Sequence, residues 1–266
     1  MRRPLRLTTV LATAALAAAG AVVGTAPSEA IVGGSSVKDG GYRFMASVQD
    51  ADGHFCGGSV ITSRWVLTAA HCMTEQDGST TRPGTLRVVV GRTDLSQTSK
   101  GQTLRVDRVR VHPRYAATGT HDVALLHTTR AMRVPAIRLV STTNNRLERD
   151  GARVTVAGWG SEAFGLPFGP SRMKAVRLSV VADGKCTLNS LTGFHPATEI
   201  CADALGGDSC QGDSGGPLFG TLADGRRVQV GVVSYGVGCA TPGFPGVYAE
   251  VNNPSTHGFL TRVAGL

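Results

Sequence analysis

A serine in the last third of the chain, Ser214, has surroundings that suit a nucleophile. It lies in the glycine-rich stretch Gly206–Pro217. A serine hydroxyl attacks a carbonyl readily only when a nearby base removes its proton. The glycines let the backbone turn sharply and let a substrate carbonyl come close. The backbone N–H groups of Gly212 and Ser214 are then candidates for stabilising an oxyanion. This stretch therefore predicts acyl-transfer chemistry.

A base and an acid that could activate Ser214 lie upstream of it. His71 lies near the end of the stretch Leu67–Cys72, and Asp122 directly precedes an apolar run. A lone histidine or aspartate is more often structural, but together with a serine the two can form a catalytic triad. The order His, Asp, Ser argues against an α/β-hydrolase esterase, whose serine precedes its acid and its histidine. About fifty residues follow Ser214, and their sole histidine is His257.

The blocks around these residues resemble the chymotrypsin/trypsin family of serine proteases. The resemblance covers about residues 31–265 and also includes Ile31–Gly34, Ala157–Gly160 and Pro245–Tyr248. It implies an all-β fold of two six-stranded antiparallel Greek-key β-barrels, with the active site between them and a short C-terminal helix. It also implies that His71 is the general base, that Asp122 orients it, and that Gly212 and Ser214 form the oxyanion hole. No cofactor is expected.

The chain divides into a leader and one peptidase domain. Residues 1–30 indicate a signal peptide, with room for a very short propeptide, and residues 31–266 form the expected trypsin-like domain. Short apolar runs between turns, such as Phe44–Val48 and Arg153–Gly160, predict strands. The polar residues 141–151 separate a first barrel at about 31–140 from a second at about 152–250. Asn253 before Pro254 predicts the short terminal helix.

The leader has the features of a secretion signal. Three arginines in its first six residues precede an apolar run, Leu11–Val23, which is too short to span a membrane. Ser28-Glu29-Ala30 fits a small-x-small cleavage site. We therefore expect a secreted, extracellular protein with no membrane segment in its mature form. The alanine-rich leader and the lack of extra domains suggest a bacterial exoenzyme.

The residues that follow the leader resemble the mature N-terminus of the family. The resemblance implies a zymogen in which cleavage before Ile31 frees an α-amino group that pairs with Asp213. Such a buried ion pair can hold a loop in one of two states. Residue 30 is alanine, so a protease of trypsin-like specificity should not cut there readily. A signal peptidase or a protease of another specificity is expected to expose Ile31.

Asp208, six residues before Ser214, predicts the substrate preference. In the trypsin branch an aspartate at this position lies at the base of the specificity pocket, where a buried carboxylate favours a cationic partner. Small residues in the wall strands leave room for a long arginine or lysine side chain. The expected substrate-binding residues are Asp208, Ser209, Ser234, Gly236, Gly238 and Gly246. Tyr235 stands where many relatives have tryptophan, so the preference of the neighbouring subsite stays open.

The six cysteines predict disulfides in an oxidising compartment. The resemblance pairs Cys56 with Cys72, Cys186 with Cys201, and Cys210 with Cys239. No CxxC or HExxH spacing is present, so no metal site is expected. Residues 92–100 correspond to the loop that binds calcium in vertebrate trypsins, but here they contain one carboxylate and two cations. Calcium needs several anionic oxygen ligands, so we expect no calcium in this loop.

The remaining charges and histidines receive no functional assignment. The formal net charge is +8, but the lysines and arginines are scattered and no nucleic-acid-binding motif occurs, so no nucleic-acid partner is expected. His121 is not expected to take part in catalysis. Structural or exposed roles are assigned to His54, His112, His127, His195 and His257.

Together these features predict a secreted serine endopeptidase that cleaves after Arg or Lys through an acyl-enzyme. Its expected partners are protein or peptide substrates and protein protease inhibitors, and it is expected to be a monomer. One alternative is a catalytically silent relative that only binds partners. A second is a protease with chymotrypsin-like specificity, and a third is an esterase.

Overall fold

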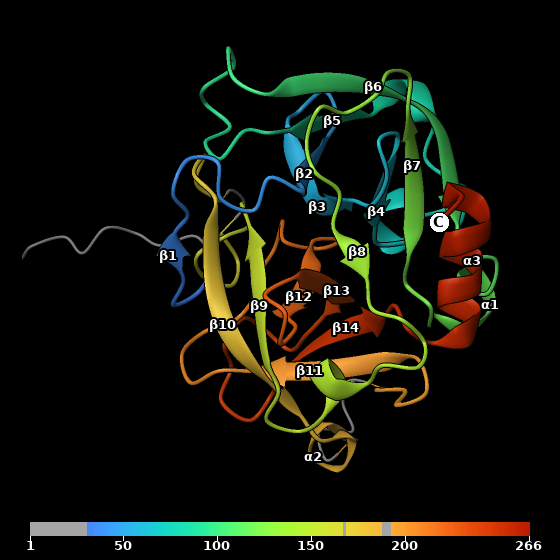
Figure 1. Ribbon diagram of the computed structural model, residues 1–266. Helices are drawn as coiled ribbons and strands as arrows, with labels where there is room; N and C mark the ends of the chain where they lie inside the picture. Colours follow the sequence, from blue (N-terminus) through green and yellow to red (C-terminus); the bar gives the residue numbers. More distant parts are fainter. Residues whose placement is uncertain (1–30, 167–168, 188–192) are drawn as a thin grey trace, which may run out of the picture.

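The computed structural model describes residues 31–166, 169–187 and 193–266. The expected signal peptide lies outside the described residues. Two β-barrels lie one above the other, and a C-terminal helix lies along one side of the upper barrel (Figure 1).

The first barrel consists of six antiparallel strands. They are β2 (Met45–Gln49), β3 (His54–Val60), β4 (Trp65–Thr68), β5 (Arg87–Val90), β6 (Gln102–Val111) and β7 (Ala124–Thr128). The sheet closes in the order β2-β3-β4-β7-β6-β5. Along β6 buried and exposed residues largely alternate, as the period of two in a strand requires. One face of β6 therefore fills the barrel while the other meets solvent.

The second barrel repeats this arrangement. Its strands are β9 (Arg153–Gly158), β10 (Lys174–Val181), β11 (Glu199–Asp203), β12 (Pro217–Thr221), β13 (Arg227–Tyr235) and β14 (Gly246–Glu250). The order β10-β11-β14-β13-β12-β9 closes because β9 also pairs with β10. If each barrel's strands are numbered along the chain, both barrels have the order 1-2-3-6-5-4. The expected all-β fold of two six-stranded antiparallel barrels is confirmed.

Two short strands attach to the second barrel from outside its own sequence range. β1 (Ser35–Ser36) pairs with β10, and β8 (Arg138–Leu139) runs parallel to β13. The segment that follows the leader therefore crosses to the second barrel before the chain enters the first. This crossing brings residue 31 close to the loops that precede Ser214.

Helical segments are short. They are α1 (Tyr115–Thr118), α2 (Asp183–Thr187), α3 (Pro254–Ala264) and the 3₁₀ turns η1 (His71–Met73), η2 (Pro83–Thr85) and η3 (Arg146–Glu148). The Asn253 side chain accepts hydrogen bonds from the backbone of Ser255 at 2.9 Å and of Thr256 at 3.2 Å, so it caps α3 as the sequence predicted. Gly265 ends the helix with φ 73°.

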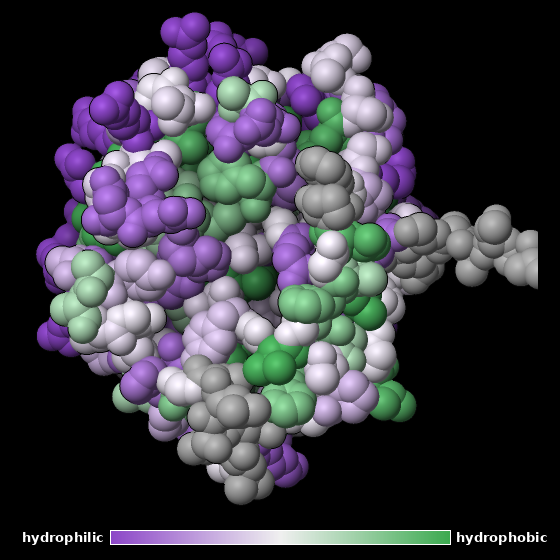
Figure 2. Space-filling view, turned by 180° about the vertical axis from the view of Figure 1, so that it is seen from behind, coloured by the Kyte–Doolittle hydropathy of each residue, from purple (hydrophilic) through white to green (hydrophobic). Residues whose placement is uncertain are grey.

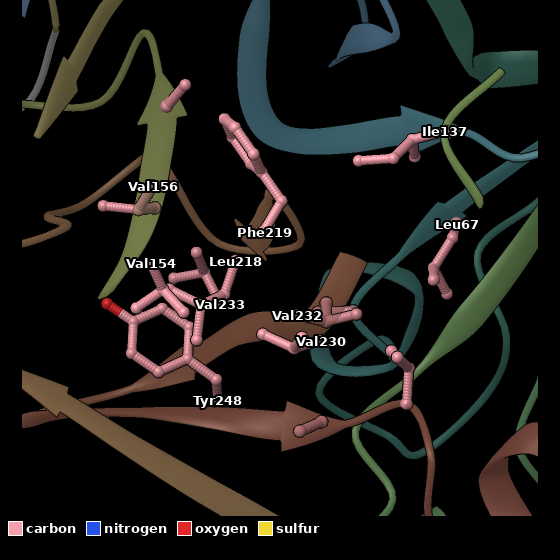
Figure 3. Packing of buried hydrophobic residues seen from close by; sticks show 14 of the residues in the cluster. Leu67, Ile137, Val154, Val156, Leu218, Phe219, Val230, Val232, Val233 and Tyr248 are labelled. Atoms are coloured by element: carbon pink, nitrogen blue, oxygen red, sulfur yellow. The ribbon is translucent and has the colours of Figure 1, made fainter. Parts of the chain in front are cut away.

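The largest hydrophobic cluster joins the two barrels. It contains Leu67 and Leu125 of the first barrel together with the inner residues of β9, β12, β13 and β14. Figure 3 shows Val154, Leu218, Val233 and Tyr248 close together within the second barrel, with Leu67 and Ile137 on the side of the first. A shared core fixes how the barrels lie against each other, and this holds the residues that each contributes to the site.

The outer surface is largely polar. In the view from behind, hydrophilic residues gather over the upper part of the molecule, where the first barrel lies, and the face is hollowed near its centre (Figure 2). Among the described residues, no helix has the length and apolar character that crossing a membrane would need.

Candidate active site

The structure brings His71 and Asp122 into direct contact. Asp122 lies just before β7 and is only 4% exposed. Its Oδ1 accepts a hydrogen bond from the His71 backbone at 2.8 Å, and its Oδ2 lies 2.7 Å from His71 Nδ1. Two bonds to one residue fix both the position and the rotation of the imidazole. They also place the Nδ1 proton toward the carboxylate, so Nε2 is left to accept a proton.

His71 and Asp122 each change the pKa of the other. Burial by itself would lower the pKa of His71, but the hydrogen bond and negative charge of Asp122 raise it overall. Burial would likewise raise the pKa of Asp122, but the hydrogen bonds and charge of His71 lower it, helped by Ser234. The pair therefore favours an ionised carboxylate beside an imidazole that can become cationic, as a general base requires.

Ser234 has a role that the sequence did not indicate. It was expected only in the wall of the substrate pocket, and the residue does line that pocket. Its hydroxyl, however, donates a hydrogen bond of 2.6 Å to Asp122 Oδ2, the same oxygen that faces His71. Ser234 lies in β13, 112 residues from Asp122, so only the packing of the two barrels reveals this contact.

The loop that carries Ser214 packs against β3 and the end of β4. The backbone N–H of Gly57 donates to the Ser214 carbonyl at 2.7 Å, and Gly215 N–H donates to the Val233 carbonyl at 2.8 Å. Gly215 has φ 81°, and a Cβ there would lie 2.2 Å from Thr68 Oγ1. Only glycine fits this close approach with a positive φ, which explains the glycine after the serine.

Cys72 lies between the histidine and the nucleophile loop. Its Sγ is 3.6 Å from His71 Nε2 and 3.7 Å from the Ser214 carbonyl oxygen. Among the described residues, no hydrogen bond joins Ser214 Oγ to His71 Nε2. Such catalytic hydrogen bonds often tighten only when substrate is bound.

The carbonyl of Gly212 is held by a histidine, His54. Gly212 has φ 93°, and its carbonyl oxygen lies 3.0 Å from His54 Nε2. His54 Nδ1 lies 2.8 Å from Ser47 Oγ. Burial lowers the pKa of His54 to about 4, so the ring is neutral near pH 7. The neutral ring donates from Nε2 to the carbonyl of Gly212 and accepts from the Ser47 hydroxyl at Nδ1.

His54 thus anchors one of the two residues expected to form the oxyanion hole. The sequence assigned no function to it, and it is separated from Gly212 by 158 residues. Nothing in the local pattern of residues distinguishes it from the other histidines. His54 lies in β3 (His54–Val60), which pairs with β2. Its contact with Gly212 can be recognised only in the folded chain, where the loop that carries Ser214 lies against β3.

Asp213, directly before the nucleophile, is a completely buried carboxylate. Its oxygens accept hydrogen bonds from the backbone of Gly160 at 2.8 Å and of Cys210 at 2.9 Å. Burial raises the pKa of Asp213 to about 7, and the negative charge of Asp208 adds to this effect. A carboxylate in this environment is costly to ionise without a cation nearby.

The segment that starts at Ile31 is packed against the loops before Ser214. Ile31 is 0% exposed and has φ 54°, which a β-branched residue adopts only under strain. The next residue, Val32, accepts a hydrogen bond from the Asp208 backbone at 3.1 Å. The expected activation residue Ile31 therefore lies in the same region of the second barrel as the specificity and nucleophile loops.

A pocket of about 210 Å³ has Ser214 as part of its lining. All six expected substrate-binding residues line it: Asp208, Ser209, Ser234, Gly236, Gly238 and Gly246. A Cβ on Gly246 would lie 2.8 Å from Asp208 Oδ1. A side chain at this position would therefore cover the carboxylate.

Asp208 is 6% exposed and is held by its neighbours. Its Oδ1 accepts from the Ser209 backbone at 2.8 Å, and its Oδ2 accepts from the Ala240 backbone at 3.1 Å. Burial raises the pKa of Asp208 to about 6. The pocket lining thus includes a fixed carboxylate that a cationic side chain would neutralise.

All three bridges that the resemblance implied are present. Cys56–Cys72 links β3 to η1, Cys186–Cys201 links α2 to β11, and Cys210–Cys239 closes one side of the pocket. The sulfurs of Cys56 and Cys72 lie near His71 as a metal site would require. They are joined to each other, however, and so cannot act as thiolate ligands.

The loop at residues 92–100 has a cation in its interior. Arg92 is 8% exposed, and its guanidinium donates hydrogen bonds to the carbonyls of Lys100 at 2.9 Å and Thr98 at 3.0 Å. These bonds use carbonyl oxygens that point into the loop. A positive charge at this position opposes the binding of a calcium ion there.

Comparison with known proteins agrees with this geometry. The family model described as trypsin matches residues 31–256. Trypsin delta of Drosophila melanogaster is 36% identical over 229 residues, which cover 83% of this chain and 84% of the relative. Hypodermin-B of Hypoderma lineatum is 37% identical over 226 residues, or 84% of this chain and 83% of the relative. These relatives come from insects, so they do not support the bacterial origin suggested by the leader. The chain belongs to the trypsin family and is a trypsin-like serine endopeptidase.

Proposed function

We propose that this endopeptidase cleaves after arginine or lysine, with Ser214 as nucleophile, and that it acts outside the cell. The observation that carries the proposal is a pocket lined by both Ser214 and Asp208, whose carboxylate is buried. A long cationic side chain can reach this carboxylate while the peptide bond that follows it lies at Ser214. An uncharged side chain of similar size would leave the carboxylate unpaired.

The proposed mechanism uses the contacts described above. His71 Nε2 takes the proton of Ser214 as its Oγ attacks the substrate carbonyl. Asp122 keeps the Nδ1 proton in place and stabilises the imidazolium that forms. The backbone N–H groups of Gly212 and Ser214 bind the oxyanion, and one such donor is worth about 3–4 kcal/mol in the transition state.

The intermediate then breaks down in two stages. His71 returns its proton to the departing amine, which leaves an acyl group on Ser214 Oγ. A water molecule attacks this ester with His71 again as base, and the acid is released with Ser214 restored. Binding of the substrate cation at Asp208 positions the reacting carbonyl for both stages.

Activation is proposed to begin with cleavage before Ile31. Cleavage frees the α-amino group of Ile31 and removes the preceding peptide unit, which relieves its left-handed conformation. The new cation can neutralise Asp213, whose carboxylate is fully buried and accepts hydrogen bonds, among the described residues, from backbone N–H groups alone. N-terminal sequencing of the secreted, active protein tests this step. A mature chain that begins elsewhere would contradict it.

The specificity is tested with matched peptides that carry Arg or Phe before the scissile bond. We expect kcat/KM to favour Arg by at least about a hundredfold, because a buried unpaired carboxylate costs several kcal/mol. An Asp208→Ser variant should lose this preference yet still be labelled at Ser214 by an organophosphate. A preference for Phe would indicate chymotrypsin-like specificity. Absence of labelling would indicate a silent relative. Protein inhibitors that present Arg or Lys to the pocket are the further partners we propose, for a monomeric enzyme.

A further inference from the structure

A second, larger hollow lies away from the pocket of Asp208. It has a volume of about 860 Å³ and is formed by the chain around β1, by β10 and by the start of β13. It shares no lining residue with the pocket beside Ser214. Figure 1 shows β1 beside β10 at the edge of the second barrel. We call this hollow the rear groove. Its volume lies within the range of about 300–1,000 Å³ that is typical of ligand sites.

The charged residues of the rear groove are all cations. Lys38, Arg43, Arg177 and Arg227 line it, all four are exposed, and the described lining residues include no Asp or Glu. In the part of the chain that the structure describes, none of the four forms an ion pair with Asp or Glu. Like charges inside a concave surface reinforce one another's field and attract anions.

The strand register shows how two of these cations come to share the groove. Arg177 of β10 is directly opposite Thr155 of β9, which is opposite Phe219 of β12. The ring of Tyr42 packs edge-on against Phe219, with centroids 5.0 Å apart. The Arg227 guanidinium lies 5.0 Å from the centroid of that Tyr42 ring. This connected row belongs to the barrel itself, so the cations project from a fixed support.

The chemistry of the lining favours one class of anion. Guanidinium groups bind oxyanions through paired N–H donors, and the hydroxyl-bearing residues Ser35, Ser36 and Thr155 also line the groove. Nucleotide bases would not find a free aromatic face at Tyr42 on which to stack. The Tyr42 ring is already covered by Arg227 and packs against phenylalanines. A polymer with many hydroxyls and permanent negative charges suits these groups.

We propose that the rear groove binds a sulfated oligosaccharide. Sulfate esters supply oxyanions for the arginines, and sugar hydroxyls supply partners for the serine and threonine side chains. The leader does not suit the groove as an occupant, since it contains three arginines and a single glutamate. Binding here would tether the enzyme to a sulfated matrix while the pocket beside Ser214 remains free.

The test measures binding of a heparin decasaccharide to the full chain, with Ser214→Ala to prevent self-digestion. One variant carries Arg43→Gln, Arg177→Gln and Arg227→Gln. The matched control carries Arg105→Gln, Arg108→Gln and Arg110→Gln, which remove the same charge from exposed positions on β6. A third variant replaces the groove arginines by lysine. Titration calorimetry at two salt concentrations gives Kd, and thermal unfolding checks that every variant is folded.

We expect the glutamine variant of the groove to bind at least about tenfold more weakly, with a smaller dependence on salt. The β6 control should bind nearly as well as the parent. The affinity of the lysine variant should lie between those of the groove glutamine variant and the parent. If both glutamine variants bound heparin equally weakly, the proposal would be overturned, because heparin would then be attracted by the protein's overall positive charge. Equally tight binding of poly-glutamate or single-stranded DNA would overturn the assignment to a sulfated glycan, as would absence of heparin binding.

Discussion

The contact between His54 and the Gly212 carbonyl makes a specific kinetic prediction. In a His54→Ala variant, the peptide unit of Gly212 loses the 3.0 Å hydrogen bond from Nε2. The loop can then rotate away from the geometry in which its N–H points at the oxyanion. One neutral hydrogen bond contributes about 0.5–1.5 kcal/mol, which corresponds to a fall in kcat of about two- to tenfold. Loss of a whole oxyanion donor lowers kcat by about 100- to 1,000-fold, which sets an upper limit on the effect of His54→Ala.

The effect should appear in kcat and leave KM nearly unchanged, because the oxyanion forms only in the transition state. His54 is neutral near pH 7, as burial lowers its pKa to about 4, so the pH profile above pH 5 should not move. His54→Gln keeps an amide N–H on the side chain and should recover part of the loss. The assay is steady-state hydrolysis of an arginyl peptide, with thermal unfolding measured in parallel.

His127→Ala is the matched control for the loss of an imidazole. His127 lies on β7 and contacts Asp107 at 2.6 Å, on the outside of the first barrel. The His127→Ala substitution should leave kcat unchanged. A raised KM with unchanged kcat in His54→Ala would refute the reasoning. Equal losses in the alanine and glutamine variants would also refute it, because the effect would then not depend on a donor.

Three further predictions concern other groups. The ratio of kcat/KM for Arg over Phe peptides should rise between pH 5 and 7, because burial raises the pKa of Asp208 to about 6 and a protonated pocket cannot attract a cation; a flat ratio would contradict this. Burial raises the pKa of Glu250 to about 8 and of Glu148 to about 7, so the folded state binds more protons than the unfolded state in this range. The contribution of these two carboxyls to the free energy of unfolding should therefore fall as the pH rises from about 5 to 8, and Glu250→Gln should remove part of this pH dependence from the urea-unfolding midpoints. Arg92→Met removes two charged hydrogen bonds inside a loop and should lower the free energy of unfolding by about 2–3 kcal/mol, whereas the exposed control Arg105→Met should change it by less than about 0.5 kcal/mol.

Much of the site could be expected from the sequence because its chemistry depends on residue types. The glycines around Ser214 indicate a turn that only small residues allow, and the order of His71, Asp122 and Ser214 separates this family from hydrolases with another fold. Because residue 208 is an aspartate, the residue type alone predicts a negative charge in the pocket. The all-β fold followed from the same resemblance, and the structure confirms it.

Other features could not be predicted, since they join residues that are far apart along the chain. Ser234 was expected in the pocket wall, but that its hydroxyl bonds Asp122 depends on how β13 lies against the first barrel. The crossing of β1 to the second barrel depends on a two-residue pairing with β10, which leaves no periodic signal. The interior position of Arg92 likewise depends on the path of a loop.

The sequence by itself determined which reactive groups the protein has, their order, and the charge in the pocket. Tertiary structure decided which atoms support them, and His54 shows why. A histidine ring has no local signature for donating to a carbonyl 158 residues away, because that contact arises only when two closed barrels pack on a shared core. The four cations of the rear groove come from three separate parts of the chain, and only the folded barrel, with the segment around β1 paired to β10, brings them to one concave surface.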